Sequence, residues 1–98
     1  MKKTKKSIDG TFFHGTTINA TLAEMREILG EPCSTGNDKS NFNWFMETEG
    51  GEVFTVYDWK YYRSLVETEK VDWHIGAHTT KASHAGLLEI LEALAKVS

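Results

Sequence analysis

Two short segments combine large aromatic side chains with groups that can bind a ligand or exchange a proton. The first is Tyr57-Asp58-Trp59-Lys60, and the second is Trp73-His74-Ile75-Gly76-Ala77-His78. Each segment ends a run of residues typical of a β-strand. A strand that only fills a core needs no Asp, Lys or His beside its Trp residues. We therefore expect the two strand ends to meet and form a single site.

The second segment leads directly into the start of a helix, where free N–H groups and a partial positive charge favour an anion. Thr79, Thr80 and Lys81 add hydroxyl groups and a cation at that point, and Trp59 adds a flat ring for stacking. The residues that we expect to bind a ligand are Trp59, Lys60, Tyr61, Arg63, His74, His78, Thr79, Thr80 and Lys81. This set predicts an anionic, nucleotide-like small molecule. The simpler alternative is that Thr79 or Thr80 only caps the helix.

The same histidines could serve a metal site or a catalytic site. A His-x-x-x-His pair binds metal from one face of a helix, but here His74 lies on a predicted strand and His78 follows Gly76. In a hydrolase, Asp58 or Asp72 would orient one of these histidines as a general base. No nucleophile-elbow sequence or P-loop accompanies them. The residues therefore favour a non-catalytic protein without metal or cofactor, and a small His-dependent hydrolase is the third interpretation.

Composition bounds the class of protein. The chain has 98 residues, enough for one small domain, of which 40% are apolar and 26% charged. No apolar run approaches the roughly 18–20 residues of a membrane span. The basic start is followed by Ser7-Ile8-Asp9-Gly10 and not by an apolar stretch, and the single Cys33 has no internal disulfide partner. These features predict a cytoplasmic protein without a membrane partner.

The charge distribution argues against binding of duplex nucleic acid. The net charge is −3, and four of the eleven cations lie within the first six residues. The remainder of the chain is strongly acidic, whereas binding to a duplex depends on neutralising its phosphates. We expect residues 1–10 to form a basic flexible tail and residues 11–98 to form a single domain.

The first half of the chain predicts a strand followed by a helix. Thr11–Gly15 is short and apolar, and the polar residues Thr17–Thr21 are expected to cap the helix that follows. Apolar residues from Leu22 to Leu29 have helical spacing. Thr21 and Glu24 have the spacing of a capping box, and Gly30 with Pro32 ends the helix.

The second half predicts a hairpin, a further strand and a closing helix. Phe42–Thr48 and Val53–Trp59 flank the turn Glu49–Glu52. A three-residue turn sets Trp44 opposite Val56 and Met46 opposite Phe54, whereas a two-residue turn would pair Trp44 with Tyr57; burying like faces together favours the first. After a loop over residues 60–70, the strand 71–76 alternates between buried and exposed positions, and a helix spans about 81–97. Its apolar stripe consists of His84, Leu87, Leu88, Leu91, Leu94 and Ala95, and Ile90 and Val97 widen it. We expect this helix to face the core, either entirely or with an oligomer contact on its other side. The predicted fold is α+β: an antiparallel sheet of about four strands in the order β-α-β-β-β-α, with both helices on one face.

Two resemblances accompany these patterns. Ile28-Leu29-Gly30-Glu31-Pro32 with Trp44 in the next strand resembles the small repeat of β-lactamase-inhibitor proteins and of an outer-membrane assembly lipoprotein. Val-Tyr-Asp-Trp-Lys, then Trp-His-Ile-Gly-Ala-His and a closing helix, resembles small accessory proteins encoded by bacteriophages and prophages. The second resemblance implies a role in counteracting a host system, either by blocking a host protein or by sequestering a nucleotide signal.

The leading interpretation is a small cytoplasmic binding module for a nucleotide-like anion. Because so small a domain encloses a ligand more easily between subunits, this interpretation also allows a homo-oligomer. The alternative is an inhibitor that binds a host protein through an acidic and aromatic surface. That surface would use Asp58, Glu67, Glu69 and Asp72.

Overall fold

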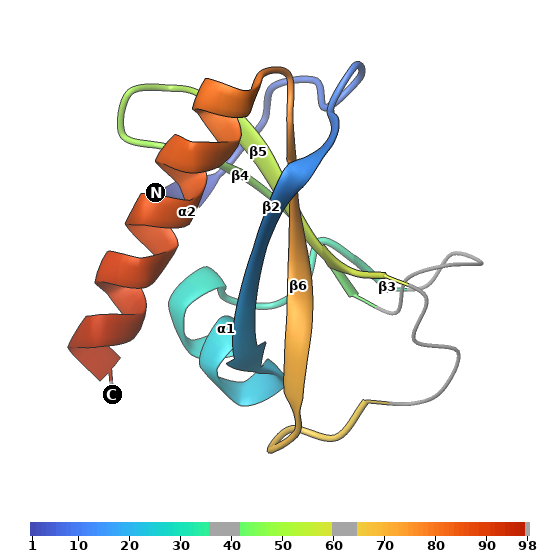
Figure 1. Ribbon diagram of the computed structural model, residues 1–98, viewed down its shortest axis with the longest axis vertical. Coiled ribbons are helices and arrows are strands. Elements are labelled where there is room, and N and C mark those ends of the chain that lie inside the picture. The colour runs from blue at the N-terminus through green and yellow to red at the C-terminus, as the bar shows by residue number, and fades with distance from the viewer. Residues whose placement is uncertain (36–41, 60–64, 98) are drawn as a thin grey trace.

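The chain folds as an α+β domain in which two helices pack against an antiparallel sheet, as predicted (Figure 1). The computed structural model describes residues 1–35, 42–59 and 65–97, and of residues 34 and 35 only the backbone is described. The elements in chain order are β1 (Lys2–Lys3), β2 (Phe12–Thr21), α1 (Leu22–Leu29), β3 (Ser34–Thr35), β4 (Phe42–Glu47), β5 (Val53–Asp58), β6 (Lys70–Ala77) and α2 (Thr80–Val97).

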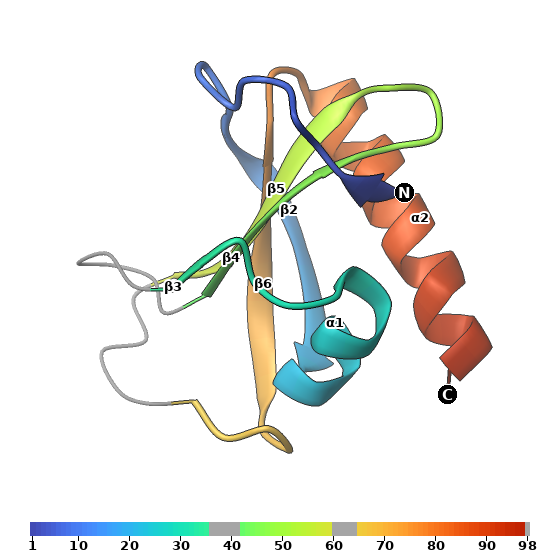
Figure 2. The same cartoon turned by 180° about the vertical axis from the view of Figure 1, so that it is seen from behind.

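The strands lie in the order β1-β4-β5-β6-β2, and β3 also pairs with β4 (Figure 2). All the pairings are antiparallel. The predicted number of strands was approximate, because β1 comes from the segment that the sequence predicted to be a flexible tail. Its two residues pair with Glu47 and Met46. The chain must then pass from one edge of the sheet to the other before β2 begins.

Strand β2 is longer than the sequence predicted. The expectation that Thr17–Thr21 only caps the helix was wrong, because these residues continue the strand and pair with β6 from His74 to Lys70. Ile18 and Ala20 are buried, whereas Thr17 and Asn19 are exposed. This alternation is the pattern of a half-buried strand, and the β-branched Thr and Ile side chains favour it. Thr17, Asn19 and Thr21 are residue types that also cap helices, which hides this alternation in the sequence.

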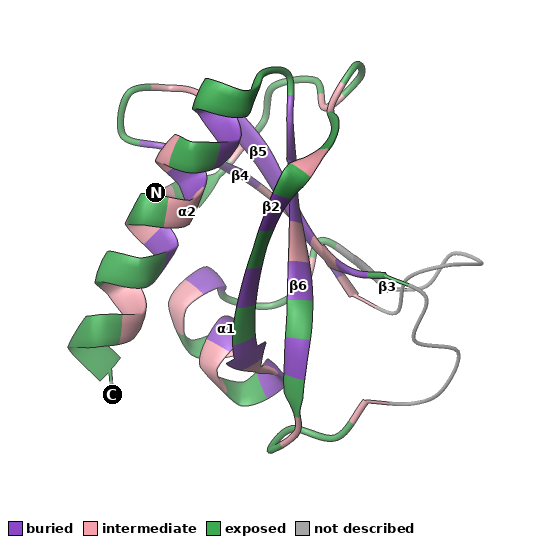
Figure 3. Cartoon of the chain, viewed as in Figure 1, coloured by how far each residue is buried: buried purple, intermediate pink, exposed green. Residues whose placement is uncertain are grey.

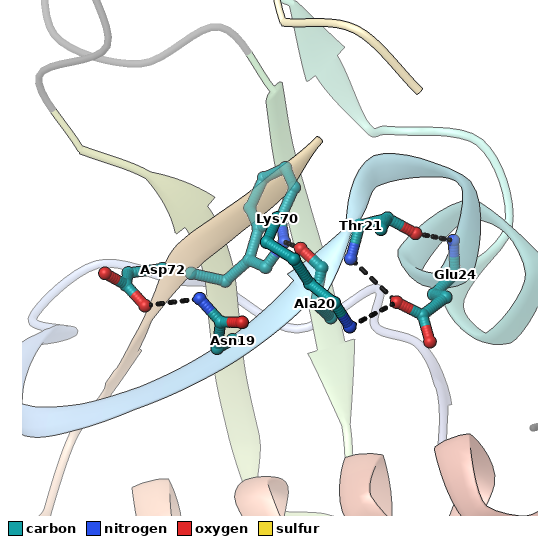
Figure 4. Close-up of polar contacts among 7 residues, drawn as sticks. Asn19, Ala20, Thr21, Glu24, Lys70 and Asp72 are labelled. Atoms are coloured by element: carbon teal, nitrogen blue, oxygen red, sulfur yellow. Dashed lines mark hydrogen bonds and ion pairs between the residues drawn. The ribbon is translucent and has the colours of Figure 1, made fainter. Parts of the chain in front are cut away.

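Helix α1 begins as predicted. The hydroxyl of Thr21 accepts a hydrogen bond from the Glu24 backbone N–H at 3.1 Å, and the Glu24 carboxylate accepts one from the Thr21 N–H at 2.8 Å (Figure 4). Both bonds of the capping box are therefore present. Lys70, at the start of β6, lies 3.3 Å from the same carboxylate and ties the helix start to the sheet.

The hairpin of β4 and β5 has the predicted register, with Trp44 opposite Val56 and Met46 opposite Phe54. Thr48 N–H donates to the Glu52 carbonyl at 2.9 Å, which closes a three-residue turn. Gly51 in this turn has φ of 85°, a conformation that favours glycine. The prediction succeeded because burying like faces together admits only one of the two turn lengths.

The core lies between the sheet and the two helices. Trp44 and Trp73 are fully buried and meet edge to face, with 5.3 Å between their ring centres. Each indole N–H is satisfied: Trp44 donates to the Gly30 carbonyl at 2.8 Å, and Trp73 donates to the Ala20 carbonyl at 3.0 Å. Such bonds let a Trp side chain be buried without an unpaired donor. They also fix both ends of α1 against the sheet.

Helix α2 presents a different face to the core than the sequence predicted (Figure 3). Its buried residues are Ala82, Ser83, Gly86 and Ile90. Leu87 and Leu94 pack partly against the core, but His84, Leu88 and Leu91 are exposed, the two leucines by 64% and 46%. The predicted stripe was therefore wrong in part. Small residues allow the helix to approach the sheet closely, and the larger leucines are left outside.

Candidate functional site

In the described part of the chain, α1 and α2 lie on one face of the sheet (Figure 1), and the strands direct every second side chain to the opposite face. On that outer face, register places Thr55, Gly76 and Phe13 in one row across β5, β6 and β2. The next row brings Tyr57 beside His74, followed by Thr17. Residues from three strands that are distant in sequence are therefore neighbours on this face.

Four rings gather there, and we refer to Phe13, Tyr57, Trp59 and His74 as the outer aromatic cluster. The His74 ring stacks on Phe13, with centres 4.1 Å apart and planes 17° apart. On its other side His74 stacks with Trp59 at 6.1 Å and 23°. Tyr57 meets Trp59 edge to face at 6.0 Å and lies 5.6 Å from His74. Phe13 and Trp59 are 41% and 38% exposed, so the cluster faces solvent.

The backbone around Gly76 explains why Phe13 can reach His74. Gly76 lies opposite Phe13 on β2 and opposite Thr55 on β5. A Cβ atom at Gly76 would lie 2.7 Å from the Thr55 hydroxyl, so a larger residue would disturb this row. A register shift between Phe13 and Thr16 follows, with Gly15 at φ of 86°. Such a bulge re-aims the side chains beside it.

The environment of the cluster keeps its ionisable members neutral near pH 7. Burial lowers the pKa of His74, and the negative charge of Asp72 opposes this effect only in part. Burial also raises the pKa of the Tyr57 hydroxyl. The imidazole of His74 therefore acts mainly as a third flat ring between Phe13 and Trp59.

The polar border of the cluster carries a negative charge. The Asp72 carboxylate accepts a hydrogen bond from the Asn19 amide at 2.8 Å, across the outer face from β6 to β2 (Figure 4). Asp58 is different, because it is fully buried and accepts a hydrogen bond from the Phe42 N–H at 2.7 Å. It lies opposite Trp73 at the end of β5. Asp58 thus stabilises the hairpin.

The start of α2 forms a separate polar cluster. The Thr79 hydroxyl accepts a hydrogen bond from the Ala82 N–H at 3.0 Å, so Thr79 is the cap. The rings of His14 and His78 hydrogen-bond the backbone carbonyls of Ala77 and Asp9, at 2.9 and 2.8 Å. These contacts hold β2 and the preceding segment against the end of β6.

The predicted site is assembled only in part, because Tyr57 and Trp59 lie beside His74 but the start of α2 lies at the other end of β6. Strand β5 ends with Asp58 beside Trp73, whereas α2 follows Ala77, which pairs with Phe54 at the start of β5. Four residues of extended strand separate these positions, a distance of about 13 Å. The structure brings together Trp59 and His74, and separately His78, Thr79, Thr80 and Lys81. Lys60, Tyr61 and Arg63 lie outside the described residues.

The sequence patterns included Tyr57 in the predicted segment but did not indicate Phe13 and His14 as neighbours of the predicted residues. Phe13 was read only as part of a short apolar strand. Its place on the outer face follows from the alternation of Thr17 to Ala20, once that segment is recognised as strand. The pairing with β6 changes register between Phe13 and Thr16, and no feature of the sequence marks this position except Gly15.

Other features of the described chain add no further site. Within ranges 1–35, 42–59 and 65–97, no three His, Cys, Asp or Glu side chains come close enough to hold a metal ion. A hollow of ≈ 370 Å³ lies between α2 and the β4–β5 turn, lined among others by Glu49, Glu89 and Glu92. It shares no residue with the outer aromatic cluster. None of the helices in the described part of the chain combines the length and the apolar character that crossing a membrane requires.

The chain was compared with known proteins at three levels. No model of a protein family, no curated protein and no solved structure matches it. Its function must therefore be argued from the geometry of the site itself.

Proposed function

We propose that this chain is a small non-catalytic binding module that recognises a partner protein through its outer aromatic cluster. The observation that carries the proposal is the solvent exposure of Phe13 and Trp59 on the sheet face that neither α1 nor α2, the helices of the described residues, covers (Figure 1). Exposing large aromatic side chains costs free energy, on the order of 2–3 kcal/mol for each one left in water. A cluster of such residues on a surface often marks a contact site.

The composition of the cluster fits a protein partner. Tyr and Trp are enriched among the residues that dominate binding energy at protein interfaces. The cluster lies on the surface of the sheet. Among the described residues, the Asp72 carboxylate supplies a negative charge at its border. With a net charge of −3, the chain would meet a neutral or basic partner surface most favourably.

A nucleotide-like anion is the second candidate, because the stacked rings of Phe13, His74 and Trp59 could receive a base. This candidate needs cations beside the rings. Lys60 and Arg63 follow Trp59 in sequence, whereas Lys81 lies on α2 after the opposite end of β6. The action on a host system, the phage origin and the cytoplasmic location remain predictions from the sequence.

Catalysis by His74 has the least support. Of the two predicted orienting residues, Asp58 is buried and accepts a hydrogen bond from the Phe42 N–H, and the Asp72 carboxylate accepts one from the Asn19 amide. His78 Nε2–H donates a hydrogen bond to the Asp9 backbone carbonyl. A hydrolase would need a different base and a nucleophile beside it.

The test compares a Trp59→Ala variant with a Leu88→Ala control. Both change one exposed apolar residue, on opposite sides of the molecule, so circular dichroism should show intact folds. The immobilised wild-type protein and the control should capture the same partner in stoichiometric amount from a bacterial extract. Trp59→Ala should weaken this capture by at least about tenfold, the loss of a hot-spot residue.

Quenching by acrylamide gives a second measurement, since Trp44 and Trp73 are fully buried and Trp59 is exposed. The captured partner should shield Trp59 from the quencher. If the partner binds Trp59→Ala as tightly as the wild type, the proposal is wrong. If instead a nucleotide raises the melting temperature of the wild type and not of Trp59→Ala, the second candidate replaces it.

A further inference from the structure

Strand β2 leaves one edge of the sheet open. It is the longest strand, with ten residues, and it pairs with β6 on one side. Within the described residues, no strand pairs with its other side. In the view of Figure 1, β2 lies in front of β6, and no described helix or strand crosses in front of it. An unpaired strand edge presents a row of backbone donors and acceptors that another extended chain can complete.

The opposite edge of the sheet is closed. Along β4, the Phe45 carbonyl accepts a hydrogen bond from the Thr4 N–H at 3.0 Å, and the Asn43 carbonyl accepts one from the Cys33 N–H at 2.7 Å. Phe45 N–H in turn donates to the Cys33 sulfur at 3.4 Å. Strands β1 and β3 pair with the two ends of β4. The backbone groups that a second chain would need at this edge are therefore already occupied.

The side chains of β2 carry none of the features that protect an edge strand. Its sequence, Phe-Phe-His-Gly-Thr-Thr-Ile-Asn-Ala-Thr, contains no Lys, Arg, Asp, Glu or Pro. Proteins usually place charges or proline on an exposed edge to prevent pairing. In a chain that is 26% charged, an uncharged stretch of this length on an open edge is suited to pairing.

We propose that two copies of this chain pair through β2, antiparallel and about a two-fold axis near Ile18. A chain that pairs with this edge must itself present an extended backbone. The β2 strand of a second copy does so, and because β2 has no charged side chains the two strands do not repel each other. A contact made by the same edge on both copies closes at two, because the β4 edge is not free to continue the array. This proposal does not depend on the function of the outer aromatic cluster.

The alternation of β2 makes this pairing self-consistent. Centred on Ile18, it sets Thr17 of each copy opposite Asn19 of the other on the outer face. In the proposed dimer, the regular stretch from Thr16 to Ala20 pairs with β6 on one side and with the second copy on the other. The bulge lies outside this stretch. Both outer aromatic clusters then lie on the same face of one continuous sheet. A bivalent surface of this kind gains avidity for a partner that repeats its own binding site.

A single strand pair buries less than the roughly 1,200–2,000 Å² of a stable interface. We therefore expect a dimer that forms at about micromolar to tens-of-micromolar concentration. Sedimentation velocity over a range from about 1 μM to about 500 μM should show the conversion of monomer to dimer. Amide hydrogen exchange in β2 should slow as the dimer forms.

A charge-swap experiment tests the contact. Thr17 is exposed and lies on the outer face, so Thr17→Lys and Thr17→Glu should fold. Each variant alone should dimerise at least about tenfold more weakly, since the two like charges at position 17 lie diagonally across the contact. An equimolar mixture should recover a dimer. Thr68→Lys, in an exposed turn, is the matched control and should dimerise as the wild type does.

Three results would overturn the proposal. The wild type could remain a monomer over the whole range, which would leave the edge for an extended segment of a different protein. Thr17→Lys and the Thr68→Lys control could dimerise equally well. The mixture of oppositely charged variants could also fail to recover a dimer while both variants keep their melting temperatures.

Discussion

His74 and Asp58 illustrate how the role of an ionisable residue depends on the face of the sheet to which its strand directs it. Both side chains lie near the same end of the β5–β6 pair. His74 points to the outer face and is stacked between two rings, whereas Asp58 is fully buried and bonded to the Phe42 N–H. The sequence presents both as candidates for chemistry, but the alternation of strands sends them to opposite faces of the sheet.

Removing the Asp58 carboxylate should destabilise the fold. In Asp58→Ala the Phe42 N–H loses its acceptor, and an unsatisfied backbone donor costs about 1–3 kcal/mol. Asp72→Ala is the matched control, because Asp72 is exposed and bonds the Asn19 side chain. We expect the control to lose less than about 1 kcal/mol of unfolding free energy in urea titrations. Equal losses in the two variants would contradict the role assigned to Asp58.

At the level of elements, α2 and the β4–β5 hairpin are joined by a close approach. A Cβ atom at Gly86 would lie 2.7 to 3.0 Å from three ring carbons of Phe54, which is fully buried. Glycine at this position lets the helix backbone lie directly over the ring. This contact explains why the helix turns its small residues inward and leaves Leu88 outside.

Gly86→Ala should therefore destabilise the protein although alanine favours helices. The gain in helix propensity is about 1 kcal/mol, and the cost of overpacking the core is about 1–3 kcal/mol. A smaller side chain at position 54 should relieve the clash, so Gly86→Ala should be neutral or stabilising in a Phe54→Leu background. A double-mutant cycle by chemical denaturation measures this coupling. If Gly86→Ala stabilised the wild type, the close approach would be refuted.

At the level of the whole molecule, three ionisable groups make stability depend on pH in the same direction. Burial lowers the pKa of His74 in the folded state. Hydrogen bonds from the Thr21 backbone and hydroxyl, and then Lys70, lower the pKa of Glu24. The pKa of Glu47 is lowered by a hydrogen bond with Thr4 and then by the charge of Lys6. For each group the unfolded chain takes up its proton at a higher pH than the folded chain does.

Acidification should accordingly destabilise the fold in two stages. The contribution of His74 is complete above its ordinary pKa of 6.5 and is lost as pH falls through the lower folded value. The contributions of Glu24 and Glu47 are complete above 4.5 and are lost at lower pH. Urea denaturation at about pH 7.5 and about pH 5.5 separates the two stages.

His74→Gln removes the first stage and keeps a side chain of similar size on the outer face. The wild type should lose unfolding free energy between the two pH values, and the variant should lose less. His84→Gln is the matched control, since His84 is exposed on α2. If His74→Gln loses as much unfolding free energy between the two pH values as the wild type does, another group titrates in this range.

Much of the fold could be predicted because its signals are local. Thr21 and Glu24 form the capping box that their spacing predicts, and the hairpin has the register that its alternating residues require. Thr79 caps α2, and Val71, Trp73 and Ile75 face the core together. Each of these features depends on residues within a few positions of one another, where backbone geometry fixes which side chains meet.

The sequence by itself determined the kinds of elements, their order and the aromatic residues that lie at the strand ends. Only the tertiary structure decided which of those residues share a surface, because antiparallel pairing joins Trp59 to His74 and to Phe13, 46 positions away along the chain from Trp59. The same pairing carries the start of α2 to the other end of β6. Strand register is set by the burial of whole faces across the sheet, a sum over distant residues that no local pattern contains.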